Sequence, residues 1–173
     1  MRVINFFAGP GVGKSTTSAG LFYFMKLSRM NVEIVTEFAK DLVWEERHLC
    51  LNDQISIFAQ QNRKLERLRN KVDYAISDSP LLLGLTYAKD LPNYYQNLDA
   101  LAIEVFNSYN NLNFFIERVK PYSTVGRIQD EAGAKKKDEE VKKFLLDNQI
   151  PFDTIPGNGN AVETILKKIL SDV

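Results

Sequence analysis

The stretch Ala8-Gly9-Pro10-Gly11-Val12-Gly13-Lys14-Ser15 decides the fold of this chain. It has the glycine spacing and the Lys-Ser ending of a phosphate-binding P-loop, although alanine occupies the first position, where glycine is usual. The apolar run 3–7 before it predicts a buried strand, and the run 14–27 after it predicts a helix. This strand–loop–helix context favours a nucleoside triphosphate site over a glycine-rich turn that binds nothing.

The P-loop pattern predicts a role for each of its residues. Inward-facing backbone N–H groups and the positive end of the helix dipole hold the polyphosphate mainly through the main chain. We expect Lys14 to reach the β- and γ-phosphates, and Ser15 to offer its hydroxyl oxygen to Mg²⁺. With ATP and Mg²⁺ as ligands, the expected contacts come from Gly9, Gly11, Val12, Gly13, Lys14, Ser15 and Thr16.

Length and composition predict one soluble domain that spans residues 1–173. The chain has 22 basic and 22 acidic residues, so no overall field draws it to nucleic acid or to a membrane surface. A single cysteine, Cys50, excludes an internal disulfide and a multi-cysteine zinc site, and it favours the reducing cytoplasm, or the host cytoplasm for a phage-encoded protein. The apolar stretch 81–88 is too short to span a bilayer.

Strands and helices alternate along the whole chain. The expected strands span 3–7, 32–35, 72–77, 113–116 and 152–155. The expected helices span 14–27, a short segment from about 37 after a Thr36 cap, about 53–70, a segment up to about 89, 98–109, 134–148 and 161–170. This order predicts an α/β fold: a P-loop NTPase three-layer sandwich with a five-stranded parallel sheet, helices on both faces, and ligands at the carboxyl ends of the strands.

Two carboxylates follow the second and third expected strands. Asp78 ends the third strand, where it can hold Mg²⁺ through water or accept a proton from an acceptor hydroxyl. The alternative for Asp78 is a helix N-cap ahead of Pro80. Glu37 follows the second strand as a general base or acceptor ligand, or as a first-turn glutamate favoured by the helix dipole. The sequence does not decide between the two roles of Asp78 or between the two roles of Glu37.

The polar segment 118–133 after the fourth strand is predicted to be a lid. Phosphoryl transfer develops negative charge and must exclude water, and a closing loop with cations meets both needs. Arg118 and Arg127 are the expected catalytic cations, with Lys120 as the third candidate. The alternative is an ordinary solvated loop.

Further candidates lie on the long helix and after the fifth strand. Gln54, Gln60 and Gln61 have amides that can pair with the edge of a base, and Phe58 can stack on it. The alternative places these glutamines on the helix surface and Phe58 in the core. Asn158, within the segment 157–160, is expected to help wrap the adenine of ATP, mainly through backbone. His48 has no evident partner in the sequence.

With these motifs in view, the chain resembles the small P-loop kinases of tailed phages, which are often labelled AAA-type ATPases. The resemblance is carried by 9–16, by Val35-Thr36-Glu37-Phe38-Ala39-Lys40-Asp41-Leu42, by Ser77-Asp78-Ser79-Pro80-Leu81-Leu82 and by Arg118-Val119-Lys120-Pro121-Tyr122. More distantly, the chain is similar to deoxynucleoside kinases and nicotinamide riboside kinases. The likeness to deoxynucleoside kinases implies that Glu37 is the base. Those kinases have an acidic–Arg–Ser motif after the third strand, whereas Asp78-Ser79-Pro80 lacks the arginine, so the resemblance does not name the acceptor.

The leading hypothesis is an ATP-dependent phosphotransferase, active as a monomer or homodimer, that acts on a small nucleoside- or nucleotide-like acceptor. In a variant of this hypothesis, the phosphate acceptor is a hydroxymethyl-pyrimidine in phage DNA. Residues 64–71 or 135–137 would then supply a local basic face that binds the DNA. The alternative class is a regulatory or partner-driven ATPase. It is disfavoured because the third strand ends in Asp78-Ser79, without the adjacent glutamate that activates water in such proteins.

Overall fold

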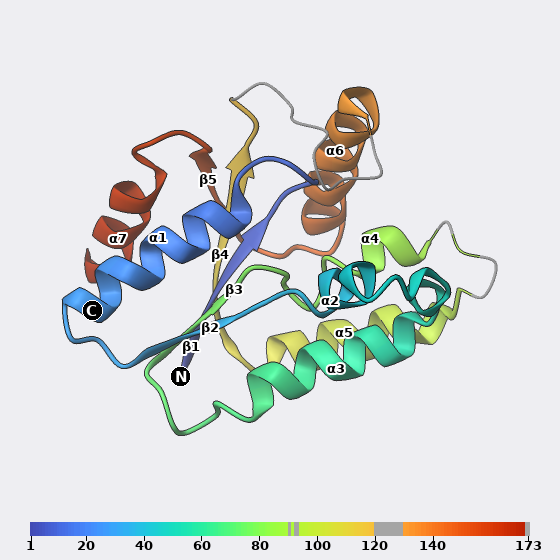
Figure 1. Cartoon of the computed structure of the whole chain (residues 1–173), viewed down its shortest axis with the longest axis horizontal. Coiled ribbons are helices and arrows are strands. Elements are labelled where there is room, and N and C mark those ends of the chain that lie inside the picture. The colour runs from blue at the N-terminus through green and yellow to red at the C-terminus, as the bar shows by residue number, and fades with distance from the viewer. Residues whose placement is uncertain (90, 92–93, 120–129, 172–173) are drawn as a thin grey trace. The chain divides into compact units, whose positions relative to one another are not determined.

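The computed structural model describes residues 1–89, 91, 94–119 and 130–171 and contains a five-stranded parallel sheet in the order β2-β3-β1-β4-β5 (Figure 1). The strands are β1 (Arg2–Phe7), β2 (Val32–Val35), β3 (Tyr74–Ser77), β4 (Asn110–Glu117) and β5 (Asp153–Pro156). The helices are α1 (Lys14–Leu27), α2 (Phe38–Trp44), the 3₁₀ helix η1 (His48–Asn52), α3 (Gln54–Glu66), α4 (Leu85–Ala88), α5 (Gln96–Asn107), α6 (Glu131–Asp147) and α7 (Ala161–Ser171). The α/β class and the parallel sheet predicted from the alternating pattern are confirmed.

The chain divides into two compact units, which we describe separately. The first unit comprises Met1–Asn5 and Asn31–Leu112, and the second comprises Phe6–Met30 and Asn113–Val173. Strand β1 contributes residues to both units. The prediction of a single domain over 1–173 stays a prediction.

In the first unit, β3 pairs in parallel with β1 on one side and with β2 on the other. Ser77 lies opposite Asn5 of β1 and opposite Val35 of β2, so the three strands are in register near their carboxyl ends. The apolar residues Ala75 and Ile76 of β3 are fully buried. The register brings the segments that carry Glu37 and Asp78 to the same edge of the sheet.

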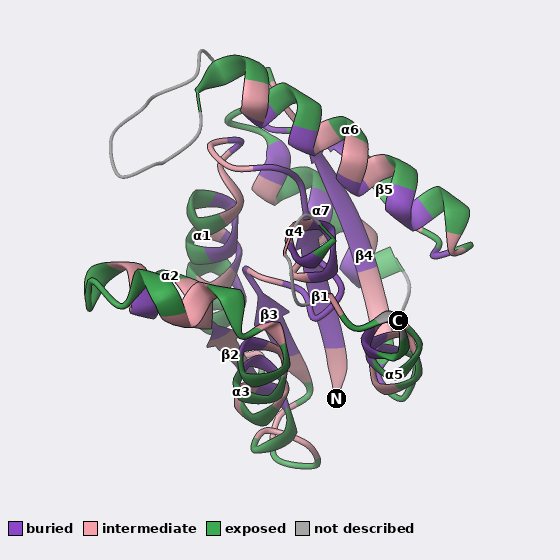
Figure 2. Ribbon diagram, turned by 90° about the vertical axis from the view of Figure 1, so that its right-hand side faces the viewer, coloured by how far each residue is buried: buried purple, intermediate pink, exposed green. Residues whose placement is uncertain are grey.

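In the second unit, β4 pairs in parallel with β5, and α1 packs against α7 (Figure 1). The two helices approach closely because Gly20 has no side chain: a Cβ there would lie 3.0 Å from a methyl group of Val162. Leu21 of α1 and Ile165 of α7 are completely buried. Figure 2 shows that β4 is buried along much of its length.

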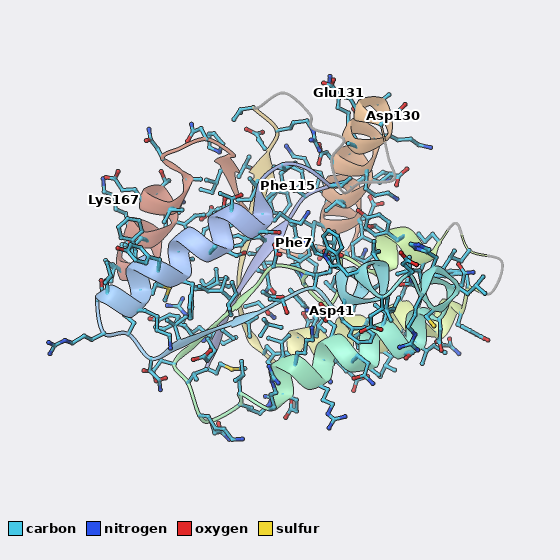
Figure 3. The ribbon with its side chains drawn as sticks, viewed as in Figure 1. Phe7, Asp41, Phe115, Asp130, Glu131 and Lys167 are labelled. Atoms are coloured by element: carbon cyan, nitrogen blue, oxygen red, sulfur yellow. The ribbon has the colours of Figure 1, made fainter. Side chains whose placement is uncertain are left out.

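Several predicted boundaries differ from the structure; β4, for example, begins at Asn110 and not at residue 113. Helix α6 begins at Glu131, within the segment predicted to be loop, because the Asp130 side chain accepts a hydrogen bond from the Gly133 N–H at 2.7 Å and caps the helix (Figure 3). Helix α3 ends at Glu66 and not near residue 70. The N-cap of α2 is Glu37 and not Thr36.

The buried face of α3 consists of Ile57, Gln61 and Leu65, whereas Ile55 is half exposed. The buried residues recur every four positions and form one face of the helix. A polar residue occupies the centre of this face because its amide is fully bonded to backbone, as described below.

No helix in the described part of the chain is both long and apolar enough to cross a bilayer.

Candidate active site

The P-loop has the backbone conformation that its glycines allow. Gly11 and Gly13 lie in the left-handed region, with φ of 79° and 112°, which residues with a Cβ adopt only at a cost. Gly13 is the N-cap of α1, and its carbonyl accepts the first helical hydrogen bond from Thr17 N–H at 2.8 Å. The predicted strand–loop–helix unit is therefore present, with the N-terminus of α1 directly after the loop.

The Lys14 side chain folds back along the loop. Its ammonium group donates to the carbonyl oxygens of Ala8 at 3.0 Å and Gly9 at 2.8 Å. Ser15 and Thr16 are exposed in the first turn of α1. A positive charge, the helix N-terminus and two hydroxyls thus lie within one short segment, which is the chemistry that a polyphosphate requires.

A carboxylate that is not among the residues predicted for the site also holds the loop. Asp138 of α6 accepts a hydrogen bond from the Gly9 N–H at 2.7 Å through Oδ1, and one from Arg118 Nε at 2.7 Å through Oδ2. Arg118 also donates from Nη2 to the carbonyl of Pro10 at 2.7 Å. The side chains of Arg118 and Asp138 are only 9% and 15% exposed. These charge-assisted bonds connect the end of β4 and the middle of α6 to the P-loop.

The sequence does contain a signal for Asp138. Ala134, Val141 and Leu145 of α6 are buried, and Asp138 continues their helical spacing. An acidic residue on the core-facing side of a helix needs a partner, and this expectation was available from the pattern. Asp138 lies within a run of charged residues, and such a run is equally typical of a helix face exposed to solvent, so the pattern did not single out Asp138.

The predicted lid is partly inside the described structure. Arg118 lies directly after β4 and reaches the P-loop as described above. Arg127 and Lys120 lie outside the described residues, as does the whole stretch 120–129. A groove of about 340 Å³ is lined by Phe115, Glu117, Arg118, Val119, Lys135, Asp138, Glu139 and Lys142. The first two residues of the predicted lid, Arg118 and Val119, therefore border this groove.

The segment after β5 contacts the P-loop backbone. Gly157 N–H donates to the Glu117 carbonyl at 2.9 Å, and a Cβ at Gly157 would lie 2.7 Å from that oxygen and 3.1 Å from the Val12 carbonyl. Asn158 is exposed, and its side-chain oxygen accepts from the Asn160 N–H at 2.9 Å. The glycine thus allows the segment predicted to bind adenine to pack closely against the P-loop.

In the first unit, the predicted carboxylates follow paired strands. The Asp78 N–H donates to the Val35 carbonyl at 3.2 Å, and Asp78 is 7% exposed. The alternative role of Asp78 as a helix N-cap is wrong, because α4 begins later and has Gly84 as its N-cap. Glu37 is the N-cap of α2 by position, without a side-chain cap bond, and is partly exposed.

Metal ligation by protein carboxylates alone is not supported within the described residues. No group of three His, Cys, Asp or Glu side chains there could hold a metal ion. A magnesium ion that is bound mainly through phosphate and water needs fewer protein ligands, such as one hydroxyl and one carboxylate.

The four candidates for base recognition have different surroundings. Gln61 is buried and bonds to backbone, Gln60 is exposed, and Phe58 is partly buried; we therefore leave Gln60 outside the acceptor site. Gln54 donates to the Leu51 carbonyl at 2.7 Å and lies near Gly84, where a Cβ would be 3.5 Å from its side-chain oxygen. Gln54 lines a cavity of about 330 Å³ together with Leu49, Asn52, Asp53, Ile55, Ala88, Leu91, Tyr94, Tyr95 and Leu98.

Acidic partners offset much of the basic face of α3. Lys64 pairs with Asp41 at 2.9 Å, and Arg69 pairs with Glu66 at 2.8 Å. The Tyr109 hydroxyl lies 2.8 Å from Glu66 Oε2; burial, followed by this bond, raises the pKa of Tyr109 to about 12. The hydrogen bonds from Arg69 and then Tyr109 lower the pKa of Glu66.

The second basic run, on α6, is paired in the same way. Lys135 lies 3.0 Å from Glu131, and Lys136 and Lys137 both pair with Glu140. His48 is exposed at the start of η1. Acidic partners therefore compensate Lys64 and Arg69 in the first run and the three lysines of the second.

Comparisons with known proteins agree with this geometry. A family model described as an AAA domain matches residues 3–162. A deoxyadenosine kinase from M. mycoides with bound dATP is 21% identical, with a TM-score of 0.61, and covers 98% of this chain and 100% of its own. The same enzyme with products dCMP and dCDP gives 20% identity and a TM-score of 0.60, covering 99% of this chain and 100% of its own.

A thymidylate kinase from Ehrlichia chaffeensis has a TM-score of 0.63 at 13% identity and covers 98% of this chain and 97% of its own. At these identities the likeness establishes the fold, which is that of P-loop kinases. A search of curated proteins finds no match to the sequence.

Proposed function

We propose that this chain, which belongs to the AAA domain family, is an ATP-dependent kinase for a nucleoside- or nucleotide-like acceptor. It moves the terminal phosphate of ATP to a hydroxyl or phosphate group of that acceptor. The observation that carries the proposal is the register of the first three strands. Ser77 pairs with both Asn5 and Val35, so Asp78 and Glu37 follow β3 and β2 at one edge of the sheet, and the P-loop follows β1 along the chain. Similarity in fold to nucleoside and nucleotide kinases supports the same reading.

On the donor side, the P-loop binds the phosphates of ATP. The N–H groups at the start of α1 and the Lys14 ammonium hold the β- and γ-phosphates, and the segment around Asn158 contacts the adenine. Arg118, held beside the loop by Asp138, offers positive charge for the oxygens of the transferred group. Arg127 is proposed as a second cation for the same group.

On the acceptor side, a carboxylate accepts the proton. As the acceptor oxygen forms its bond to the γ-phosphorus, its proton passes to Asp78 or Glu37, the bond to the β–γ bridging oxygen breaks, and ADP leaves with that electron pair. Mg²⁺, when bound, neutralises charge on the β- and γ-phosphates. The Ser15 hydroxyl and the Asp78 carboxylate are hard oxygen donors that suit this ion.

For the acceptor itself, we favour the cavity lined by Gln54, Tyr94 and Tyr95. Its volume of about 330 Å³ is at the lower end of the roughly 300–1,000 Å³ typical of small-molecule sites. Gln54 borders Gly84, in the segment that follows Asp78 along the chain. Free small molecules are favoured over modified DNA, because ion pairs offset Lys64 and the lysine run 135–137.

The experiment that tests the function is ADP production by the purified chain with ATP and Mg²⁺, alone and against a panel of acceptors. The panel contains deoxynucleosides, deoxynucleoside monophosphates, nicotinamide riboside and DNA with hydroxymethyl-pyrimidines. A kinase produces ADP in proportion to a phosphorylated acceptor and little in its absence. Steady hydrolysis that no acceptor changes would contradict the proposal and favour a partner-driven ATPase. Gln54→Leu is expected to raise KM for the acceptor and leave KM for ATP unchanged.

A further inference from the structure

We propose that Gln61 is a positioning residue that fixes the spacing between the carboxylates of Glu37 and Asp78, an inference that rests on the proposed kinase function. Gln61 lies in the middle of α3 and is 5% exposed. Its amide was a candidate for reading the base of the acceptor, but it bonds to the backbone beside both carboxylates.

The bonds of Gln61 use both ends of its amide. Oε1 accepts from the Phe38 N–H at 2.9 Å, and Nε2 donates to the Ser79 carbonyl at 3.0 Å and to the Thr36 carbonyl at 3.4 Å. Thr36 and Phe38 flank Glu37, and Ser79 follows Asp78. The side chain therefore holds the main chain on both sides of one carboxylate and directly after the other.

These bonds begin where the strand ladder between β2 and β3 ends. The strands pair up to Val35 and Ser77, and the Asp78 N–H still reaches the Val35 carbonyl at 3.2 Å. After this point the two segments lead into different elements, α2 and the turn before α4. Gln61 continues the connection through its side chain, so the Glu37 and Asp78 segments do not depend on the ladder alone for their spacing.

A neighbouring lysine supports one of the two segments. Lys64, on the next turn of α3, contacts Asp41 at 2.9 Å and the Thr36 carbonyl at 3.3 Å, and lies over the Phe38 ring at 5.6 Å from its centroid. The bonds of Lys64 stay within the turn after β2, whereas those of Gln61 reach the segments after both strands. Lys64 therefore bonds only to the Glu37 segment, whereas Gln61 bonds to both the Glu37 and the Asp78 segments.

The chemistry of the site explains why an amide is needed. A glutamate keeps the acceptor for Phe38 N–H but has no N–H group for the Ser79 and Thr36 carbonyls, and a methionine has neither. Glutamine is close to both in size, so each substitution changes bonding more than volume. A displacement of about 1 Å in a catalytic group can lower turnover roughly 100-fold, so loss of these bonds is expected to appear in kcat.

The test compares Gln61→Glu and Gln61→Met with Gln60→Glu, which makes the same charge change at the exposed neighbour. Each variant is measured for kcat, KM for both substrates, ATP affinity and thermal unfolding, with an acceptor that the wild-type protein phosphorylates. We expect Gln61→Glu and Gln61→Met to lose roughly 10–100-fold in kcat, with ATP affinity within about threefold of wild type. Gln60→Glu keeps wild-type values.

A second measurement separates positioning from simple stability. If Gln61 acts through the carboxylates, Gln61→Met in a Glu37→Gln background lowers kcat by less than it does in the wild-type protein. The positioning role is overturned if folded Gln61 variants keep wild-type kcat, or if only KM for the acceptor rises. Absence of phosphate transfer by the wild-type protein would instead overturn the proposed function, and the positioning role with it.

Discussion

Asp138 accepts a hydrogen bond from the backbone N–H of Gly9 at 2.7 Å, so a helix far along the chain holds the first glycine of the P-loop. The contact is tight, because a Cβ on Gly9 would lie 2.7 Å from Asp138 Oδ1 and 2.8 Å from the Ala134 carbonyl. The other oxygen of Asp138 accepts from Arg118, which bonds to Pro10. The P-loop is thus fixed by α6 and by the residue that follows β4, in addition to its own glycines.

Asp138→Asn is predicted to weaken this arrangement. Asparagine keeps one carbonyl oxygen but loses the negative charge opposite Arg118, and a buried cation without its counter-charge costs roughly 1–3 kcal/mol or more. We expect a lower free energy of unfolding and weaker ATP binding, measured by urea denaturation and calorimetry. Asp147→Asn is the control, because it removes an exposed ion pair with Lys143 on the same helix and is expected to cost at most about 1 kcal/mol. Equal effects of the two substitutions would contradict a special role for Asp138.

Gly9→Ala is predicted to displace the P-loop from α6. The added methyl group meets the Ala134 carbonyl, which belongs to helix backbone and cannot move freely. Overpacking of this kind costs roughly 1–3 kcal/mol, and we expect the apparent Kd for ATP to rise. Gly84→Ala is the matched control, since a Cβ there makes only an ordinary contact, 3.5 Å from the Gln54 side-chain oxygen, and Gly84 is not proposed to bind ATP. ATP binding by Gly9→Ala at wild-type strength would show that this close approach has no bearing on the nucleotide site.

The donor half of this site was largely predictable from the sequence, and the acceptor half was not. The strand, the P-loop and α1 follow from consecutive residues, and α1 has the predicted bounds 14–27. Asp138 bonds to Gly9, more than a hundred positions away in the chain. Gln61 bonds to backbone about twenty positions away on either side. No local sequence pattern encodes such pairs. The sequence leaves Gln61 as either a base-binding amide or a surface residue, because an amide in a helix has no visible partner in sequence and its backbone partners appear only after folding.

The pH dependence of stability is predicted to involve Glu66. Bonds from Arg69 and Tyr109 lower the pKa of Glu66 in the folded protein. A carboxyl with a lowered folded pKa stabilises the protein above its ordinary pKa, and this contribution is lost as the pH falls through the folded value. Glu66→Gln is therefore expected to lower the free energy of unfolding by roughly 0.2–1 kcal/mol at pH 7 and by less at pH 3. Urea denaturation at both values checks this, with Glu104→Gln as an exposed control; a difference that does not shrink at acid pH would contradict the assignment.

Asp78→Asn and Glu37→Gln are predicted to separate the two proposed proton acceptors. Loss of the general base lowers kcat by roughly 100- to 10,000-fold, while loss of the other carboxylate has a smaller effect. Because Asp78 is also a proposed magnesium ligand, its substitution is expected to raise the Mg²⁺ concentration needed for half-maximal rate, and Glu37→Gln is not. Rates titrated with Mg²⁺ make this distinction, and an unchanged requirement in Asp78→Asn would remove Asp78 from the metal site.

The central claim, that Lys14 and its loop deliver the terminal phosphate of ATP to an acceptor, is tested most directly by following that phosphate. ATP labelled with ¹⁸O in the γ-phosphate is incubated with the purified chain, Mg²⁺ and a mixture of deoxynucleosides and deoxynucleoside monophosphates. Mass spectrometry then locates the label. We predict labelled phosphate on one member of the mixture, and its loss in Lys14→Met. Label that appears only in inorganic phosphate, at a rate that the mixture does not change, would contradict the claim.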